Sequence, residues 1–204
     1  MKIPLNVNYE EKQDAKNNGA QWDAKNKLWY LWDYKKLPDV KKWLNPDYNI
    51  YITENVYLVS GFRNCFKCNN STKVYSIGAD KFVYFDEQWK FYPAFYLING
   101  IESYSKNLIN LLELTNNKLK LLFSKTINSK YLANTCEYCN MLQGDNFLYN
   151  EYDAAFSPNS VSEVDLTIKK IPLELDIGIK GNLFSSYNDK GNSNNIIWNG
   201  AKHI

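Results

Sequence analysis

Apolar residues along this chain are spaced mostly as in short strands. β-Branched and aromatic residues dominate residues 50–60, which predicts a single strand that leads into the first cysteine pair. Near the C-terminus, residues 164–168 and 173–179 alternate between apolar and polar, which predicts an antiparallel pair added late to the sheet. Further strands are expected over residues 72–77, 81–85, 119–123 and 124–131, with an aromatic core segment at 91–98.

Helical spacing is clearest within residues 105–116. Leu108, Ile109, Leu111 and Leu112 fall on one apolar stripe, and Ser105 is placed to cap the helix. Residues 189–195 are rich in Asn, Ser and Gly and predict a loop or tail. The apolar residues 196–198 that follow it are expected to dock back onto the core.

The first forty-five residues look like a separate small module. The pattern predicts a strand over residues 2–8, a helix over 9–18, a turn at 21–23, a strand over 27–32 and a short helix over 38–44. Gly19 is expected to end the first helix as its C-cap. In the short helix, Val40, Trp43 and Leu44 are expected to face inward.

Asn45-Pro46-Asp47 is typical of a linker, which predicts two domains at residues 1–46 and 47–204. The expected fold class is α+β. It consists of a strand–helix–strand–helix module and an antiparallel-sheet module that is clipped by a split four-cysteine zinc knuckle pair. No run approaches the roughly 18 apolar residues of a membrane span, so no membrane partner is expected.

All four cysteines of the chain fall in two C-x-x-C pairs, Cys65/Cys68 and Cys136/Cys139. A two-residue spacer lets one tight turn direct two sulfurs at one ion, and two such turns complete a tetrahedral zinc site. Each pair is followed by an Asn, a residue that tolerates the left-handed turn of such loops. The pairs therefore predict structural Zn²⁺, since four sulfurs leave no open coordination position.

Three alternatives to zinc stay open at this stage. Two disulfides would require an oxidising compartment, whereas Met1-Lys2-Ile3-Pro4 leads into polar sequence with no signal-peptide pattern, so a cytoplasmic location is expected. A thioredoxin-like redox pair should follow a strand and open a helix. Four unrelated buried thiols would not pair so regularly.

The first module contains six short segments that together form a specific pattern: Leu5-Asn6-Val7, Tyr9-Glu10-Glu11-Lys12, Ala15-Lys16, Gly19-Ala20, Trp22-Asp23 and Lys27-x-Trp29-Tyr30. This pattern resembles a small bacterial domain of unknown function that is also found attached to plasmid primases of the TraC type. The resemblance covers residues 3–44 and implies an association with mobile elements.

Four of the six tryptophans lie in this module, and Trp22 and Trp29 are expected in its core because a small module needs bulky aromatics to bury enough surface. The alternative is a stacking and phosphate-binding face for single-stranded nucleic acid. A basic stretch is also commonly just a solvated face. The residues of this candidate binding face are Lys25, Lys27, Tyr30, Trp32, Lys35, Lys36, Lys41 and Lys42.

The second cysteine pair lies in Tyr131-x-x-Asn134-Thr135-Cys136-x-x-Cys139 and is followed by residues 142–151, which begin Leu142-Gln143-Gly144-Asp145. These segments resemble the tail of uncharacterised bacterial proteins, in which two distant knuckles imply a zinc-ribbon-like module without assigned activity. The resemblance covers roughly residues 56–160, and this chain has Tyr149 where those proteins tend to have His. Gly144 is expected to take a positive φ. Asp145 and Glu151 are expected to cap and bond turns, with an acid or base role as the alternative.

The sequence contains no G-x-S-x-G, P-loop or H-E-x-x-H motif, and its one histidine, His203, lies at the end. A non-catalytic binding protein is therefore expected, with nucleic acid as partner. A protein partner, as for an immunity or anti-defence protein, and an uncharacterised enzyme are the alternatives. No small-molecule substrate is indicated, and the net charge of +2 favours neither partner class.

Overall fold

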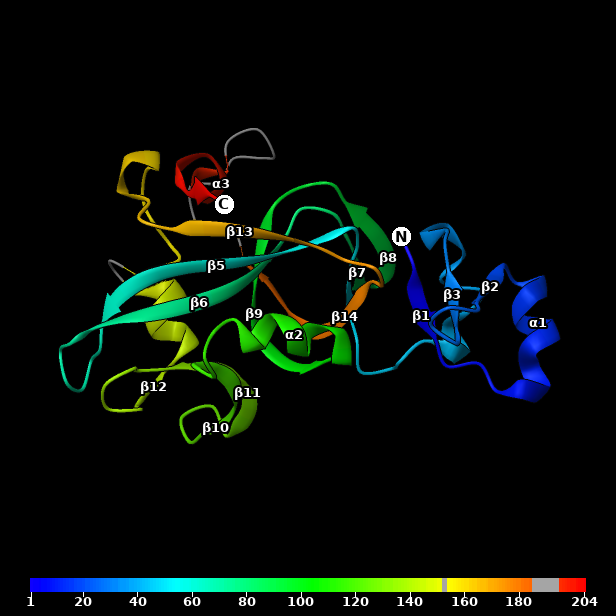
Figure 1. Cartoon of the computed structure of the whole chain (residues 1–204), viewed down its shortest axis with the longest axis horizontal. Coiled ribbons are helices and arrows are strands. Elements are labelled where there is room, and N and C mark those ends of the chain that lie inside the picture. The colour runs from blue at the N-terminus through cyan, green and yellow to red at the C-terminus, as the bar shows by residue number, and fades with distance from the viewer. Residues whose placement is uncertain (152–153, 185–194) are drawn as a thin grey trace.

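The structure is a computed structural model of residues 1–204, and it describes residues 1–151, 154–184 and 195–204. It confirms the α+β class: most regular structure is strand, and the helices are short. The strands form three sheets, one of nine strands and two of three (Figure 1). Among the described residues, no helix is both long and apolar enough to span a membrane.

The nine-stranded sheet is the centre of the molecule, with the order β15-β13-β5-β6-β9-β14-β4-β7-β8. Its neighbouring strands run antiparallel except for the short β13–β15 pair, which is parallel. The strands are β4 (Ile50–Ile52), β5 (Asn55–Asn64), β6 (Ser71–Ala79), β7 (Phe82–Asp86), β8 (Gln88–Tyr92), β9 (Tyr96–Tyr104), β13 (Thr167–Pro172), β14 (Ile177–Phe184) and β15 (Lys202–His203).

The single strand predicted over residues 50–60 is wrong, because the chain breaks into β4 and β5 at Glu54. Glu54 has a φ of 61°, a left-handed conformation that ends strand pairing. β4 then pairs with β14 and β7, whereas β5 pairs with β13 and β6. One apolar run therefore supplies strands to two distant parts of the same sheet.

The predicted pairing of the two late strands with one another is also wrong. β13 pairs with β5, and β14 lies between β9 and β4. Both late strands add to strands formed much earlier in the chain, and such long-range partners leave no mark in the local alternation of residues.

Both faces of the large sheet are buried, which explains why β5 is a nearly continuous apolar run. Val56 and Leu58 face one core, shared with the helix α2 (Ile109–Glu113). Tyr57 and Val59 face a second core, which includes Ile197 of the helix α3 (Ile196–Gly200).

The C-terminal helix confirms the expected docking of residues 196–198. The Trp198 ring lies 5.3 Å from the ring of Tyr57 and 4.9 Å from that of Phe95. Of the loop expected at residues 189–195, only Asn195 lies within the described residues. Its side chain accepts a hydrogen bond from the Trp198 N–H, so it caps the helix.

The helix predicted over residues 105–116 is present as a 3₁₀ turn, Lys106–Leu108, followed by α2. Leu108, Leu111 and Leu112 are buried as expected, but Ile109 is exposed. Ser105 does not cap this helix. Its hydroxyl accepts a hydrogen bond from the backbone N–H of Gly178, so it ties the helix to β14 instead.

The first module contains the three-stranded sheet β1-β3-β2 and one helix. Asn18, and not Gly19 as predicted, is the C-cap of the helix, and Gly19 follows it with a φ of 93°, a left-handed conformation that helix ends commonly use. The expected turn at residues 21–23 is wrong, because these residues lie in a strand and the turn follows at Lys27, whose φ is 52°. The bounds are β1 (Ile3–Leu5), α1 (Lys12–Asn17) after a 3₁₀ turn (Tyr9–Glu11), β2 (Ala20–Asp23) and β3 (Leu28–Leu31).

A 3₁₀ turn, Lys41–Trp43, replaces the short helix predicted over residues 38–44, and another 3₁₀ turn, Tyr34–Lys36, precedes it. Val40, Trp43 and Leu44 are nevertheless buried, as predicted.

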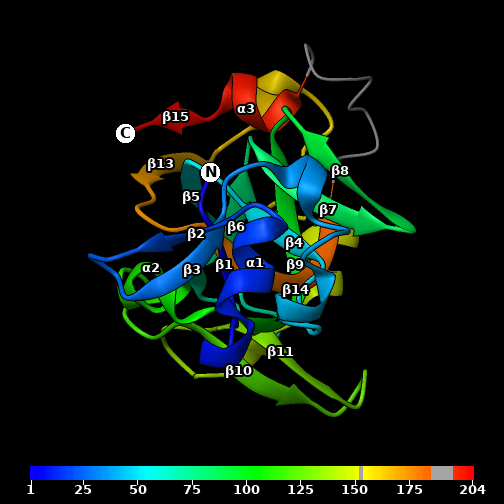
Figure 2. The same cartoon turned by 90° about the vertical axis from the view of Figure 1, so that its right-hand side faces the viewer.

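The first module packs on the outer face of β4, β7 and β8, and Figure 2 shows it in front of the large sheet. Its core includes Tyr51 of β4 and Val83 of β7. The carboxylate of Asp176 accepts a hydrogen bond from the Lys2 N–H at 2.6 Å. The two parts therefore share a buried interface, and the division at residue 46 stays a prediction.

The third sheet, in the order β10-β11-β12, follows α2 in the chain. A tight turn that contains Asn128, at a φ of 52°, joins its first two strands. The strand predicted over residues 124–131 therefore begins later, after the turn. The bounds are β10 (Leu119–Ser124), β11 (Ser129–Thr135) and β12 (Leu142–Gln143), followed by a π-helical turn (Asn146–Asn150) and a 3₁₀ turn (Val161–Glu163).

Candidate metal centre and adjoining surface

The two cysteine pairs lie in two loops of the same local structure, one between β5 and β6 and the other between β11 and β12. Both loops lie at the end of the molecule farthest from the first module (Figure 1). In the first loop, the Cys65 N–H donates to Asn70 O at 2.9 Å. In the second, the Cys136 N–H donates to Met141 O, also at 2.9 Å.

The Asn after each pair adopts the left-handed conformation that the sequence predicts. The φ of Asn69 is 57° and that of Asn140 is 56°. Each Asn N–H donates to the carbonyl of the first cysteine of its pair, Cys65 or Cys136, which closes the turn. Asn supports this backbone because its short polar side chain tolerates a positive φ.

Backbone and side-chain N–H groups point at the sulfurs. The Lys67 N–H donates to the Cys65 sulfur at 3.4 Å, and the Tyr138 N–H donates to the Cys136 sulfur, also at 3.4 Å. The Gln143 amide donates to the Cys65 sulfur at 3.3 Å. Such bonds favour the thiolate over the thiol, which is the form that binds a metal.

The four sulfurs lie within 4.8 Å of one another, and the structure thus brings together two segments far apart in the sequence. Cys65 Sγ lies 3.7 Å from Cys139 Sγ, and Cys68 Sγ lies 3.7 Å from Cys136 Sγ. Four sulfurs placed tetrahedrally about 2.3 Å from one ion would be about 3.8 Å apart. All four cysteines are free thiols, and the cluster is consistent with a metal site.

The thiols do not ionise equally on their own. Burial raises the pKa of Cys65, but the N–H groups of Cys68 and Lys67 and the neighbouring thiols outweigh it and lower this pKa to about 6. The Met141 N–H lowers the pKa of Cys139, but burial and the other three sulfurs raise it to about 11. A cation at the centre of the cluster would be needed to hold four thiolates together near neutral pH.

Polar contacts away from the sulfurs also join the two loops. The buried Asn134 side chain of β11 accepts from the Tyr75 N–H at 2.7 Å and donates to the Tyr75 carbonyl at 2.9 Å. The Thr72 hydroxyl accepts from the Glu137 N–H at 2.9 Å. Neither Thr72 nor Asn134 was predicted to have this role. Asn134, which directly follows the apolar Leu132-Ala133, was a signal for it, whereas Thr72 lies between the polar Ser71 and Lys73.

The candidate binding residues of the first module are exposed in part and engaged in part. Lys25 forms an ion pair with Glu174 at 3.3 Å. Lys42 lies 2.7 Å from the carboxylate of Asp14 and 3.2 Å from that of Glu11. These pairs reduce the charge that the two lysines could offer to a phosphate.

The other candidate residues of the first module are more available. Tyr30 is half-buried and donates its hydroxyl hydrogen to Gln21, whereas the Trp32 side chain is 56% exposed. Within the described residues no ion pair involves the remaining four, which are all exposed: Lys27, Lys35, Lys36 and Lys41.

The expectation that Trp22 lies in the core is wrong. Its side chain is 49% exposed, and its ring lies 5.5 Å from that of Trp29, which is half-buried. The tryptophan that fills the core of the first module is Trp43. It is buried, and its indole N–H donates to Glu11 at 3.0 Å.

Asp145 does not cap the turn that follows it. Its carboxylate instead accepts a hydrogen bond from the backbone N–H of Gly100, in β9, at 2.7 Å. Burial raises the pKa of Asp145 to about 6. The positive φ expected for Gly144 is absent, and it is Gly100 that has one, at 56°. Tyr149 is buried and donates a hydrogen bond to the Ser76 hydroxyl at 2.7 Å.

Replacing Asp145 with Asn is expected to change how stability depends on pH. A carboxyl whose folded pKa lies above the unfolded value of 3.8 makes the fold less stable as pH rises from about 4 to about 6. The substitution removes this loss, so Asp145→Asn should gain stability relative to the original protein on going from about pH 5 to about pH 8. Urea unfolding at both pH values measures the difference, and a difference independent of pH would contradict the burial of this carboxyl.

Two adjoining hollows lie beside the cysteine cluster and share the side chains of Phe66 and Phe147, whose ring centroids are 5.8 Å apart. The smaller hollow, about 340 Å³, is also lined by Phe62 and Arg63. The Arg63 guanidinium lies 4.6 Å from the centroid of the Phe147 ring. The larger hollow, about 570 Å³, contains Asp145.

Positive charge is concentrated around the cysteines. Residues 61–75 and 117–143, here called the four-cysteine unit, carry one acidic side chain, Glu137, against seven basic ones. The formal side-chain charge of the unit is thus +6, although that of the whole chain is +2. The basic residues are Arg63, Lys67, Lys73, Lys118, Lys120, Lys125 and Lys130.

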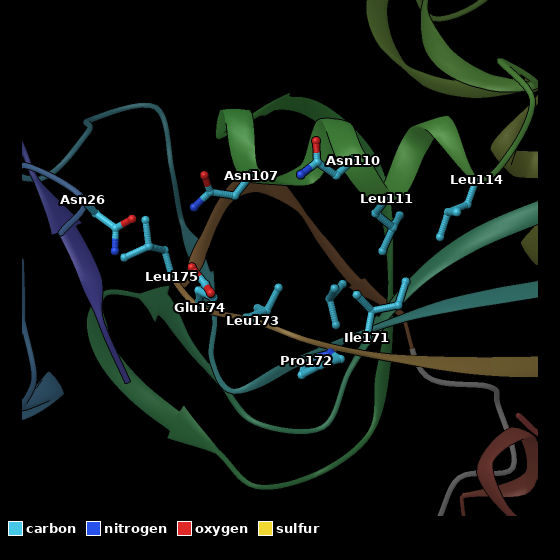
Figure 3. A pocket seen from close by; sticks show the side chains of 11 residues that line it. Asn26, Asn107, Asn110, Leu111, Leu114, Ile171, Pro172, Leu173, Glu174 and Leu175 are labelled. Carbon is cyan, nitrogen blue, oxygen red and sulfur yellow. The ribbon is translucent and has the colours of Figure 1, made fainter.

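A third hollow of about 390 Å³ lies between α2 and the end of β13, with Asn26 of the first module at one end (Figure 3). Leu111 of α2 and Leu114, the residue directly after α2, line it opposite Ile171 and Leu173 (Figure 3). Its one titratable lining residue, Glu174, forms the ion pair with Lys25. It is mainly an apolar gap between α2 and the end of β13, and of its lining residues only Asn26 comes from the first module.

Comparison with known families shows that residues 2–45 match the family described as Domain of unknown function (DUF5710). The chain thus carries this domain in its first module, which agrees with the resemblance at residues 3–44. Searches of curated proteins and of solved structures found no match.

Proposed function

We propose that the chain is a zinc-stabilised, non-catalytic protein that binds single-stranded nucleic acid through the surface beside its cysteine cluster. The observation that carries this proposal is the pair of hollows that share Phe66 and Phe147, with Arg63 at one ring, on a unit of charge +6. The proposed metal is structural Zn²⁺, bound by Cys65, Cys68, Cys136 and Cys139.

The donor set supports zinc in a structural role. Four thiolates suit a soft tetrahedral ion, and they leave no position for a water or a substrate. With four thiolates, Zn²⁺ brings a charge of −2, which the seven basic side chains of the four-cysteine unit exceed. Thiols that must stay reduced to bind the ion also support the proposed cytoplasmic location.

The exposed aromatic side chains support nucleic acid as partner. Phe62 is 59% exposed and Phe66 is 61% exposed. Because neither ring contributes to core packing, a polar residue at either position would cost the fold little. Nucleobases stack on such rings whatever their sequence, and basic side chains nearby bind the phosphates. The mixture of rings and positive charge on one unit fits a flexible polyanion better than a rigid apolar partner.

The first module would provide a second contact in this proposal. Its exposed residues Trp32, Lys27, Lys35 and Lys41 could bind the same strand. The primases with which similar domains are associated act on nucleic acid, and this supports the proposal of a role linked to mobile elements. That contact is the weaker of the two, because Lys25 and Lys42 are already paired with acidic side chains.

A protein partner is the second candidate, and the β10–β11 hairpin favours it. Leu121, Phe123 and Ile127 are 43%, 51% and 59% exposed along this hairpin. An exposed apolar row of this kind is typical of interaction surfaces. Among the described residues, catalysis has only the carboxylates of Asp145 and Glu151 in its favour, in the larger hollow.

Fluorescence anisotropy of a labelled short oligonucleotide, titrated with the zinc-loaded chain at several salt concentrations, tests the proposal. Binding should weaken steeply with salt, because basic side chains displace counterions from phosphates. Phe66→Ala should weaken it by roughly five- to 150-fold, the loss of one stacked base at about 1–3 kcal/mol. Trp32→Ala is the control that separates the two faces, and its effect should be smaller.

Absence of binding at low salt by a zinc-loaded, folded chain would contradict the nucleic-acid proposal. A larger loss for Trp32→Ala than for Phe66→Ala would move the binding face to the first module.

A further inference from the structure

We propose that the larger hollow is a base-specific pocket in which Asp145 binds a guanine of the bound strand. This inference rests on the proposed function and adds a sequence preference to it. It starts from the carboxylate of Asp145, which faces a hollow of about 570 Å³ between the first cysteine loop, the β10–β11 turn and the segment after β12.

The Asp145 carboxylate is held in place but only partly satisfied. The Gly100 N–H binds Oδ2 at 2.7 Å. Throughout the described ranges 1–151, 154–184 and 195–204, no other group donates a hydrogen bond to this carboxylate. Gly100 supplies this bond from a left-handed φ of 56° that other residues rarely adopt, and Asn182 packs where a side chain would be. The backbone thus fixes one oxygen and leaves acceptor capacity directed at the hollow.

A carboxylate is an acceptor with two oxygens side by side, so it selects a ligand with two adjacent N–H donors. Among the bases, guanine alone has this arrangement, in N1–H and the N2 amino group on its Watson–Crick edge. Adenine and cytosine place a ring acceptor beside their amino group, and uracil and thymine place a carbonyl on each side of N3–H. Each of these would set an acceptor against the carboxylate.

The remaining walls suit a planar base. The rings of Phe66, Phe147 and Tyr131 line the hollow, and the ring centroids of Phe66 and Phe147 lie 5.8 Å apart. The amides of Asn99, Asn146 and Asn182 also line the hollow and could donate to the oxygen or ring nitrogens at the far edge of a purine.

An arginine side chain of a protein partner would offer a carboxylate the same pair of donors. The seven basic side chains of the four-cysteine unit outnumber its one acidic side chain, the charge of −2 of a zinc with four thiolates and the two carboxylates in the lining, Asp145 and Glu151. The remaining positive charge favours an anionic strand over a cationic side chain at this place. The choice of guanine therefore follows from the donor pattern together with the surrounding charge, and arginine is kept as an outcome of the test.

The test compares oligonucleotides that are thymidine-only except at one central position, which carries guanine, hypoxanthine or adenine. Hypoxanthine keeps N1–H but lacks the amino group of guanine, so it removes one of the two donors. The zinc-loaded full chain should bind the guanine strand roughly tenfold or more tightly than the adenine strand, with hypoxanthine between them.

Asp145→Asn should abolish this preference, because an amide presents one donor and one acceptor in place of two acceptors. Its affinity for the thymidine-only strand should stay the same or rise, since a negative charge is lost. Glu151→Gln is the matched control. It removes the same charge from an exposed residue lining the same hollow, and the ratio of guanine to adenine affinity should not change.

The outcomes separate this inference from the proposed function. If the original protein and Asp145→Asn both bind all strands with equal affinity, the guanine pocket is overturned and nucleic-acid binding stays intact. Binding of none would overturn both. Asp145-dependent binding of an arginine-containing peptide, with no discrimination among the strands, would also overturn the guanine pocket.

Discussion

Cys136→Ser is expected to release the metal and to unfold the region around the cysteine loops. Cys136 is fully buried at the cluster, and a serine there removes one of four strong ligands. A metal bound by both pairs would close a loop of about 70 residues between them, and losing such a cross-link costs about 4 kcal/mol by loop entropy alone. Structural zinc sites in small domains contribute more than this, of order 10 kcal/mol.

Thermal unfolding followed by circular dichroism measures this loss. A chelator should lower the midpoint of the original protein as much as the substitution does, and it should have little effect on Cys136→Ser. Tyr138→Ala is the matched control in the same loop, because that side chain is 64% exposed and binds no metal. Equal midpoints for Cys136→Ser and the original protein would exclude a stabilising metal.

Trp43→Ala is expected to destabilise the first module by about 3–5 kcal/mol, the usual cost of a large buried aromatic. The Trp43 side chain is 1% exposed and packs in the core that joins the module to Tyr51 and Val83 of the large sheet. Its loss also leaves Glu11 without its indole donor, at 3.0 Å in the structure. The damage should therefore reach the interface with the large sheet.

Urea unfolding measures the cost, with Trp32→Ala as the control because that side chain is 56% exposed. Trp32→Ala should lower the free energy of unfolding by much less than Trp43→Ala does. Similar losses for the two variants would show that burial does not distinguish these tryptophans.

Local chemistry was predictable from the sequence where the deciding residues lie next to each other. Each C-x-x-C pair and its following Asn determine one turn, so the two matching loops and their left-handed Asn residues could be predicted. The helix end near Gly19 and the buried positions Val40 and Trp43 follow from patterns a few residues long.

Long-range pairing was not predictable in the same way. Nothing near Glu54 marks it as a left-handed residue, because Glu rarely takes that conformation, and so the break between β4 and β5 was missed. β13 and β14 alternate as strands should, but their partners β5 and β9 lie far back in the chain. Periodicity specifies which face of a strand is buried and not which strand lies beside it.

The hollow at Asp145 shows the same limit. The carboxylate of Asp145 is held by the backbone N–H of Gly100, 45 positions earlier in the sequence. The rings of Phe66 and Phe147 are in contact although one lies within the first cysteine pair and the other follows the second. The sequence predicted Asp145 as a turn residue because only its neighbours were visible. The lysines of the first module could be chosen as candidates because they lie close together in the sequence. Their ion pairs with acidic side chains, as at Lys25 and Lys42, could not be predicted from that local pattern.

The metal content of the purified chain tests the central claim most directly. Elemental analysis of protein expressed without added metal should find one zinc per chain in the original protein and none in Cys136→Ser. Iron in place of zinc would contradict the proposed metal, and absence of any metal from the folded original protein would contradict the metal centre on which the proposed binding surface is built.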